Sequence, residues 1–240
     1  SDLLNFEEII IFENEDYLII NKPPFVSTLD DRAKADKQNI IRLAKQYIDT
    51  AQVAHRLDRE TSGALAIAKN PEAYRHLAIQ FQDREVKKIY HAIVSGIHKF
   101  EHLTVDKALK ALNTGIVRVD TQEGKESLTI FQTLQAYQRH SLIECQPTTG
   151  RMHQIRVHLA YIKAPIAGDE QYGGKPLMLS EIKKKFNLKK NTEELPLMPR
   201  VALHAQKLGF QLLDGQAIEV EAPYPKDFRA AINQLEKHNS

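Results

Sequence analysis

The chain has 240 residues and a mass of 27.4 kDa, which fits one large domain or two modest lobes. Apolar residues make up 42% and charged residues 27%, a composition that excludes collagen-like and low-complexity proteins. No apolar run reaches the roughly 18 residues that cross a bilayer, and the acidic start lacks the basic region of a signal peptide. The single cysteine, Cys145, excludes an internal disulfide, so we expect a protein of the reducing cytoplasm with no membrane partner.

The net charge of +2 conceals an uneven distribution of basic residues along the chain. Residues 51–100 hold 8 basic and 5 acidic groups, and residues 151–240 hold 14 and 10. A local positive patch attracts phosphates even on a nearly neutral protein. Solvated surfaces are also uneven by chance, so charge alone leaves nucleic-acid binding open.

Hydrophobic periodicity predicts a succession of strands with few helices between them. The expected strands are 8–13, 17–22, 63–68, 89–94, 128–134, 141–146, 203–212 and 217–221. The expected helices are 39–48, 71–82, 152–162 and 226–236, with a polar, irregular stretch at 26–38. This order favours an α+β fold with a mixed, mainly antiparallel central sheet flanked by helices, and not a doubly wound α/β fold.

We expect one domain over residues 1–240, with residues 178–200 as a basic insertion. The insertion holds five lysines between positions 183 and 190. A solvated helix and loop is one interpretation, and an arm that contacts phosphates is the other.

The densest polar stretch of the chain is HRLDRETSG, residues 55–63, which lies directly before a strand of small residues. A loop held by a rigid strand is well placed to form a site. Asp58 lies between Arg56 and Arg59, and nearby cations favour an ionised carboxylate. Such a group can act as nucleophile, base or electrostatic stabiliser, although an ordinary surface ion pair explains the pattern equally well.

A second polar cluster is GRMHQIRVHL, residues 150–159, on the expected helix 152–162. Met152 and Ile155 belong to its apolar face, and Arg156 lies at the edge of that face. A partly buried arginine needs an anion, for which Asp58 is a candidate. His153 and His158 are five residues apart and point to different sides, which disfavours a metal site.

Tyr90 lies at the start of the expected strand 89–94, close to Lys87 and Lys88. A tyrosine at this place usually packs in the core with its hydroxyl in water. Its ring can also stack on a nucleic-acid base, so both interpretations stay open.

Four blocks, HRLDRETSG, KKIYHAIVSG, GRMHQIRVHLA and ALHAQKLGF, occur in an order and spacing that resemble RluA-type RNA pseudouridine synthases. The opening IFENEDYLIINKPP is similar to the first strands of that family. The resemblance runs from about residue 8 to residue 223. We expect no S4-like RNA-binding domain before these blocks, which would resemble the shorter branch of the family.

The resemblance implies roles for particular residues. Asp58 matches the catalytic aspartate, Tyr90 the tyrosine that packs on the target uracil, and Arg156 the arginine that pairs with the aspartate. Arg56 matches a residue that takes the place of the flipped base, and Leu203 an apolar residue of the uracil pocket. Together with Arg56, the residues expected to hold RNA are Arg59, Arg84, Lys87, Lys88 and Arg151.

The chemistry implied is an isomerisation, so it requires no cofactor, and we expect no metal. Asp58 can serve a covalent or an elimination route. The expected partner is structured ribosomal or transfer RNA, bound by a monomer. Two rivals are a non-catalytic RNA-binding or ribosome-assembly factor on the same scaffold, and a hydrolase that would release uracil with Glu60 as acid partner.

Overall fold

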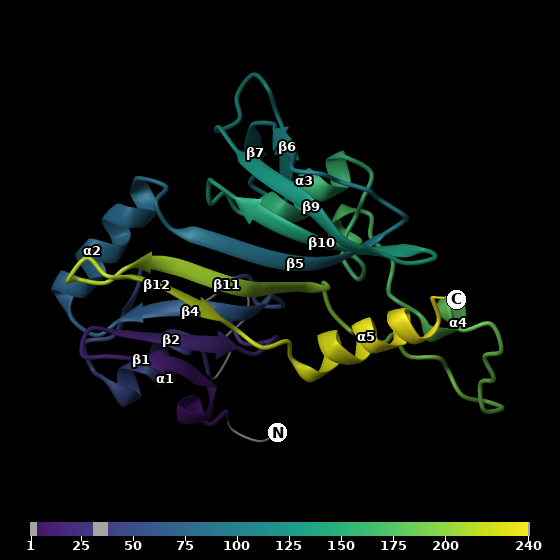
Figure 1. Ribbon diagram of the computed structural model, residues 1–240, viewed down its shortest axis with the longest axis horizontal. Helices are drawn as coiled ribbons and strands as arrows, with labels where there is room; N and C mark the ends of the chain where they lie inside the picture. Colours follow the sequence, from purple (N-terminus) through teal and green to yellow (C-terminus); the bar gives the residue numbers. More distant parts are fainter. Residues whose placement is uncertain (1–3, 31–37, 240) are drawn as a thin grey trace. The chain divides into compact units, whose positions relative to one another are not determined.

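The computed structural model describes residues 4–30 and 38–239 (Figure 1). The chain divides into two compact units. Unit 1 comprises residues 1–89 and 205–223, and unit 2 comprises residues 90–204 and 224–240. No helix in the described ranges is long and apolar enough to cross a membrane.

The strands of unit 1 neighbour one another in the order β1, β2, β4, β11 and β12, with β3 also paired to β4. The pairs β1–β2, β2–β4, β3–β4 and β11–β12 are antiparallel. Its strands are β1 (Ile10–Glu13), β2 (Tyr17–Lys22), β3 (Gln52–Val53), β4 (Ser62–Ala68), β12 (Ala217–Glu221) and most of β11 (Leu203–Gln211). Its helices are η1 (Phe6–Ile9), α1 (Ile40–Tyr47) and α2 (Pro71–Gln82). Every residue of β4 is buried, which explains why this strand consists of small and apolar residues.

The helix α2 shows why the sequence of unit 1 folds locally as it does. The Asn70 side chain accepts a hydrogen bond from the Ala73 N–H at 2.8 Å, and Pro71 occupies the first turn. Leu77 is buried in a core cluster with Tyr17 and Phe210. Capping and burial together fix α2 against β4.

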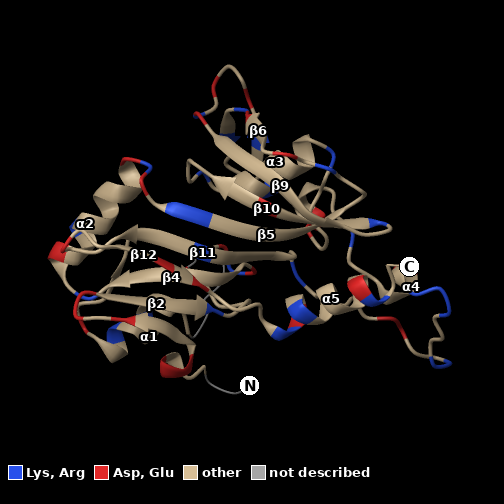
Figure 2. Ribbon diagram, in the orientation of Figure 1, with Lys and Arg blue, Asp and Glu red and all other residues tan. Residues whose placement is uncertain are grey.

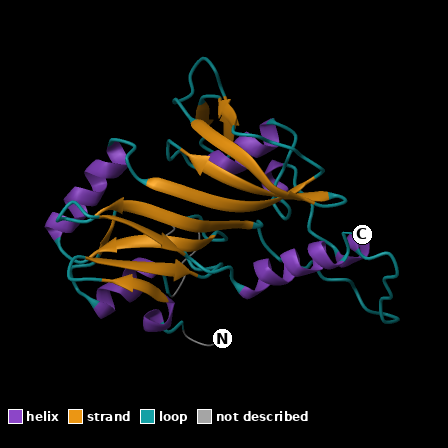
Figure 3. Cartoon of the chain, in the orientation of Figure 1, coloured by secondary structure: helices purple, strands orange, loops and turns teal. Residues whose placement is uncertain are grey.

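In unit 2 the strands follow the order β5, β10, β9 and β6, and β7 and β8 form a separate antiparallel pair. The bounds are β5 (Lys87–Ser95, which begins in unit 1), β6 (Leu103–Asp106), β7 (Leu109–Ala111), β8 (Val117–Val119), β9 (Leu128–Ala136) and β10 (His140–Pro147). The helices are α3 (Gln154–Tyr161), η2 (Glu170–Tyr172), α4 (Leu179–Ile182) and α5 (Lys226–Lys237), and Figure 3 shows the long loop that follows α4. One core cluster joins residues from β5, β10, α3 and α5.

The α+β class with a mixed, mainly antiparallel sheet, expected from the sequence, is confirmed. The longer elements lie within a few residues of their predicted bounds. Of the irregular stretch predicted at 26–38, residues 31–37 lie outside the described residues. A single domain over 1–240 with an insertion at 178–200 stays a prediction.

The prediction of a helix over 152–162 is wrong at its start. His153 adopts a left-handed backbone with φ of 56°, and α3 begins only at Gln154. Met152 is therefore outside the helix and 47% exposed, and does not join the apolar face. The strands β6, β7 and β8 were not expected, because runs of three or four residues carry too little periodicity.

Gly63 occupies a position in β4 that tolerates no side chain. Its φ is +121°, and an added Cβ would lie 2.1 Å from the carbonyl oxygen of Ala205. By contrast, Gly215 has a φ of +86° in a turn with no atom within 4 Å of an added Cβ.

We expect Gly63→Ala to lower the free energy of unfolding by about 3 kcal/mol or more, because backbone strain adds to a clash with a neighbouring strand. Gly215→Ala is the matched control, and it should lower the free energy of unfolding by only about 1–2 kcal/mol, because its positive φ is the single source of strain. Urea denaturation of both variants measures the difference. Equal losses would show that the Ala205 backbone moves away at little cost.

Candidate active site

The loop that carries Asp58 is anchored on both sides of this residue. The Thr28 hydroxyl donates to the Leu57 carbonyl at 3.0 Å and accepts from the Leu57 N–H at 3.2 Å. Leu57 itself is buried. On the other side, the Thr61 N–H donates to the Asp58 carbonyl at 3.0 Å, which closes a tight turn. The backbone of the loop is therefore fixed around the carboxylate.

The fully buried ammonium group of Lys22 also holds this loop in place. Lys22 Nζ donates to the carbonyl oxygens of Pro23, Val26 and Arg59 at 2.8, 2.7 and 3.1 Å. The Arg59 carbonyl also accepts from the Phe25 N–H at 2.8 Å. Burying a charge is costly unless it is hydrogen-bonded, and an ammonium has three N–H donors. These three bonds tie the chain after β2 to the loop at 55–63.

His55, the first residue of the loop, is a structural group and not a proton carrier. Its Nε2 accepts a hydrogen bond from the Ala66 N–H at 2.9 Å, which places the ring proton on Nδ1. The ring stacks on Phe81 with centroids 4.6 Å apart. Burial, with a smaller effect from the Lys88 charge, lowers the pKa of His55 to about 3. Burial also lowers the pKa of Lys88 to about 8.

The anchors determine which side chains the loop presents. Leu57 is buried and His55 is held against β4, whereas Arg56 is exposed and Asp58 is partly exposed. A carboxylate and an arginine on a backbone held by hydrogen bonds require little reorganisation on binding.

Arg156 makes a two-pronged ion pair within unit 2. Its Nε and Nη2 donate to the two carboxylate oxygens of Asp169 at 2.9 and 2.8 Å, and Nη2 also donates to Gln171 at 2.9 Å. The guanidinium carbon lies 4.9 Å from the ring centroid of Tyr172. Both charged side chains are at most 9% exposed. The geometry therefore fixes the orientation of the guanidinium group.

Gln154 anchors the start of α3 through all four of its hydrogen-bonding positions. Its side-chain oxygen accepts from the Thr149 hydroxyl at 2.7 Å and the Arg151 N–H at 3.1 Å. Its amide nitrogen donates to the Leu128 carbonyl at 3.0 Å and the Thr129 hydroxyl at 2.9 Å. This network compensates for the left-handed backbone that precedes the helix.

The two histidines of the 150–159 cluster are also held by hydrogen bonds within unit 2. His158 is fully buried, with Nε2 donating to the Lys107 carbonyl at 2.9 Å and Nδ1 bonded to the Thr129 hydroxyl at 2.8 Å. Burial lowers its pKa. His153 bonds the Tyr172 hydroxyl at 2.6 Å. Within the described residues, no group of three or more His, Cys, Asp or Glu is placed to hold a metal ion.

Tyr90 lies on β5 opposite the buried Cys145 of β10. It is partly exposed and packs against the core cluster of unit 2 that contains Leu203, which is itself buried. The ring therefore rests on an apolar surface with part of its area accessible.

Figure 2 marks the lysines and arginines along the chain; of the other basic candidates, Arg84 and Lys87 are exposed, and Arg59, Lys88 and Arg151 are partly buried. Arg84 is exposed with a φ of +58°, and Lys87 bonds Glu219 at 3.2 Å. The Arg59 guanidinium lies 5.8 Å from the Phe25 ring centroid, and Arg151 Nε donates to the Glu126 carbonyl at 2.9 Å. Their contact with RNA stays a prediction.

The candidates fall into both units. Unit 1 holds Arg56, Asp58, Arg59, Arg84, Lys87 and Lys88, and unit 2 holds Tyr90, Arg151, Arg156 and Leu203. The pairing of Arg156 with Asp58 joins residues of different units and stays a prediction.

Two residues that hold candidate site residues in place were not identified from the sequence, Lys22 and Asp169. Lys22 stands in the sequence NKPP, where the two prolines signal a chain reversal but not a buried charge. Asp169 stands between Gly168 and the glycines at 173 and 174. An added Cβ on Gly168 would lie 2.2 Å from the Arg200 carbonyl, so the tight loop is the one available signal.

Comparisons with known proteins agree on one family. Residues 16–161 match the model of a family described as RNA pseudouridylate synthase. The "Ribosomal large subunit pseudouridine synthase C" of Buchnera aphidicola is 36% identical over 239 residues, covering 96% of this chain and 71% of that protein. The protein of that name from Vibrio parahaemolyticus is 35% identical, covering 100% of this chain and 73% of its own length.

Solved structures agree with the fold. "Human RNA Pseudouridylate Synthase Domain Containing 4" aligns with a TM-score of 0.75 at 24% identity, covering 96% of this chain and 94% of that one. "Human RNA Pseudouridylate Synthase Domain Containing 1" aligns with a TM-score of 0.68 at 26% identity, covering 90% and 83%.

We expect Asp169→Asn to lower the free energy of unfolding by about 3–5 kcal/mol, because it leaves the Arg156 charge buried without its carboxylate. The matched control is Glu123→Gln, which breaks an ion pair with Lys110 whose carboxylate is 66% exposed. That control should cost no more than about 1 kcal/mol. Urea denaturation measures the free energy of unfolding of both variants. A similar small loss in both would show that the buried pair of Arg156 and Asp169 does not stabilise the fold.

Proposed function

Because the chain belongs to the RNA pseudouridylate synthase family, we propose that it isomerises uridine in structured ribosomal or transfer RNA to pseudouridine. The enzyme class is an RNA pseudouridine synthase, an isomerase. Ribosomal RNA is the favoured substrate, because several relatives are named ribosomal large subunit pseudouridine synthases. The observation that carries the proposal is the anchored loop that presents Asp58.

The reaction breaks the bond between N1 of uracil and C1′ of ribose and forms a bond between C5 and C1′. The base turns between these events, C5 loses its proton, and N1 gains one. No atom is added or removed overall, so the reaction as written needs no cofactor and no metal. The substrate proposed for it is uridine within RNA.

Asp58 is the group that we assign to C1′. An ionised carboxylate can attack C1′ as a nucleophile, or it can remove a proton from the sugar in an elimination route. Both routes need the carboxylate close to the ribose in a fixed orientation. The anchors from Thr28, Lys22 and Thr61 supply that fixed backbone.

Arg156 and Tyr90 are proposed to complete the site. Arg156 pairs with Asp58 and keeps it ionised, and Asp169 orients the guanidinium group for this task. Tyr90 packs on the uracil and positions the acceptor for the C5 proton. Leu203 contributes to the apolar wall of the uracil pocket, which its place in the same core cluster supports.

The target base must leave the RNA stack before it can react, at a cost of a few kcal/mol. Arg56 is exposed next to the buried Leu57, and we propose that its guanidinium takes the place of the extruded base. The basic residues Arg59, Arg84, Lys87, Lys88 and Arg151 are proposed to hold phosphates, which makes binding weaken as salt rises. We propose that the enzyme acts as a monomer.

Asp58→Asn should abolish pseudouridine formation while RNA binding persists, because the amide can neither attack C1′ nor accept a proton. Release of tritium from C5-labelled uridine in ribosomal RNA measures the reaction, and a gel shift measures binding. Glu60→Gln, which changes the nearest carboxylate in the loop, is the control and should retain activity. More than a trace of product from Asp58→Asn would remove the catalytic assignment, and free uracil in the wild-type reaction would favour a hydrolase.

Arg56→Ala should slow turnover by about tenfold or more on a folded RNA, since offsetting 1.4 kcal/mol of unstacking corresponds to a factor of ten. On an RNA whose target uridine is already unpaired in an open loop, the loss should be much smaller. Single-turnover rates on both substrates test this. An equal loss on the two RNAs would assign Arg56 to phosphate binding and not to base replacement.

A further inference from the structure

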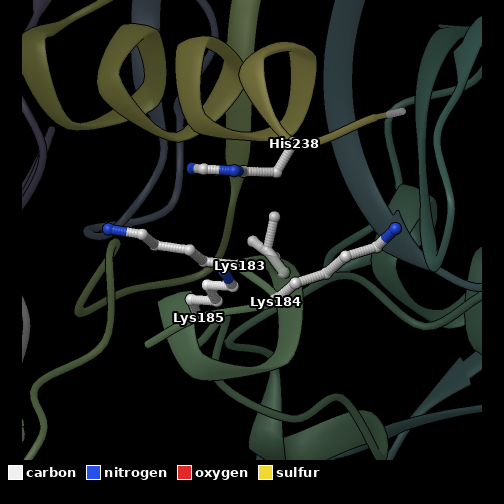
Figure 4. Close-up of a pocket in the computed structure, with 5 residues that line it drawn as sticks. Lys183, Lys184, Lys185 and His238 are labelled. Carbon is white, nitrogen blue, oxygen red and sulfur yellow. The ribbon is translucent and has the colours of Figure 1, made fainter. Parts of the chain in front are cut away.

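A small cavity in unit 2 is lined by Ile182, Lys183, Lys184, Lys185 and His238, and its volume is about 250 Å³ (Figure 4). The lysines follow the end of α4, and His238 follows the end of α5. The two helices are in contact, and Ile182 packs against the core cluster that contains Leu235 of α5. The floor of the cavity is thus fixed by the core, and its walls carry the charge.

The three lysines differ from four other lysines of the chain, which are paired with acidic side chains. Lys69, Lys87, Lys110 and Lys207 each form an ion pair with a glutamate. Across residues 4–30 and 38–239, the structure places no carboxylate within ion-pair distance of the lysines at 183–185.

In the part of the chain that the structure describes, the nearby Glu181 and Glu194 form no ion pair with the three lysines. Glu194 accepts a hydrogen bond from the Ser180 N–H at 3.2 Å, and Glu181 lines an adjacent hollow with Tyr137 and His140. Three like charges at one cavity repel one another, and an anion relieves that repulsion. Basic residues continue along the segment that follows α4 (Figure 2).

The shape of the cavity decides which anion fits. Figure 4 shows Lys183 and Lys184 pointing to opposite sides, with the ring of His238 above them. Diverging ammonium groups do not converge on one small anion, but they suit successive phosphates of a strand. The volume is below the roughly 300–1,000 Å³ of sites that enclose a small ligand. Ile182 and the imidazole ring supply a surface for a sugar or a base.

We propose that this cavity, which we name the lysine cavity, binds a single-stranded segment of the substrate RNA through its backbone phosphates. The inference rests on the proposed function, because it assigns part of the RNA contact to a site outside the residues 55–63, 87–96 and 150–160 that carry the family resemblance. The lysine cavity increases affinity for RNA and takes no part in the chemical step.

The test compares two triple variants of the full chain that remove the same charge. The cavity triple removes the charge of the lysine cavity through Lys183→Ala, Lys184→Ala and Lys185→Ala. The control triple removes three exposed lysines elsewhere in unit 2 through Lys99→Ala, Lys163→Ala and Lys175→Ala. Fluorescence anisotropy with a ribosomal RNA fragment that contains single-stranded segments gives the dissociation constant at several concentrations of KCl. The lysine-to-arginine triple at 183–185 keeps the charge.

The cavity variant should weaken binding by at least about tenfold at 0.1 M salt and reduce the slope of log K against log salt by about 2, as expected for three phosphates of a single strand. The control triple should change both much less, and the arginine triple should resemble wild type. Cross-linking of thiouridine-labelled RNA should mark the peptide containing residues 183–190. Equal affinity and slope in the cavity and control triples would overturn the proposal.

The outcomes keep this inference separate from the proposed function. Wild-type protein that forms no pseudouridine in ribosomal or transfer RNA would remove the proposed function whatever the binding slopes. If wild-type protein forms pseudouridine but the cavity triple binds RNA like the control triple, only the RNA-binding role of the lysine cavity is refuted. The single-turnover rate at saturating cavity-variant enzyme should equal that of wild type, and a lower rate would contradict a pure binding role.

Discussion

The buried ammonium group of Lys22 is the interaction on which the candidate site depends most. It donates to three carbonyl oxygens, one of them on Arg59, directly beside Asp58. Its burial is tolerated because all three N–H donors are used, and removal of the ammonium would leave three carbonyls without this donor. A loop of polar residues would otherwise be mobile and would lose entropy on every encounter with RNA. The lysine therefore converts a surface loop into a rigid support.

Unit 2 also holds a buried cationic side chain by hydrogen bonds, but here the acceptor is a carboxylate. Arg156 is buried with Asp169, and buried ion pairs contribute little net stability because desolvation offsets attraction. What the pair contributes is orientation, since two parallel hydrogen bonds fix the plane of the guanidinium group. In each unit a buried charged group thus fixes the position of one charged residue, as the proposed reaction requires.

The sequence predicts features that depend on neighbouring residues, but not contacts between residues that are distant in the chain. Helix 71–82 is correct at both ends because Asn70, Pro71 and the apolar period act within a few residues. Asp58 stands out because charges cluster around it in the chain. The burial of Arg156 implies an anion, but Asp169 is brought to it by a tight glycine loop, which periodicity cannot show. The exposed Met152 follows from one left-handed residue, His153.

Burial also decides which motif residues can carry charge. His55 and His158 are neutral near pH 7 because burial lowers their pKa values, to about 3 for His55, and both serve as hydrogen-bonding struts. A lowered pKa means that protonating His55 in the folded protein opposes folding, so stability from this residue falls as pH drops from about 6.5 to about 3. Lys88, whose pKa burial lowers to about 8, loses its charge at mildly alkaline pH. At such pH values its attraction for phosphates is weaker than that of an exposed lysine.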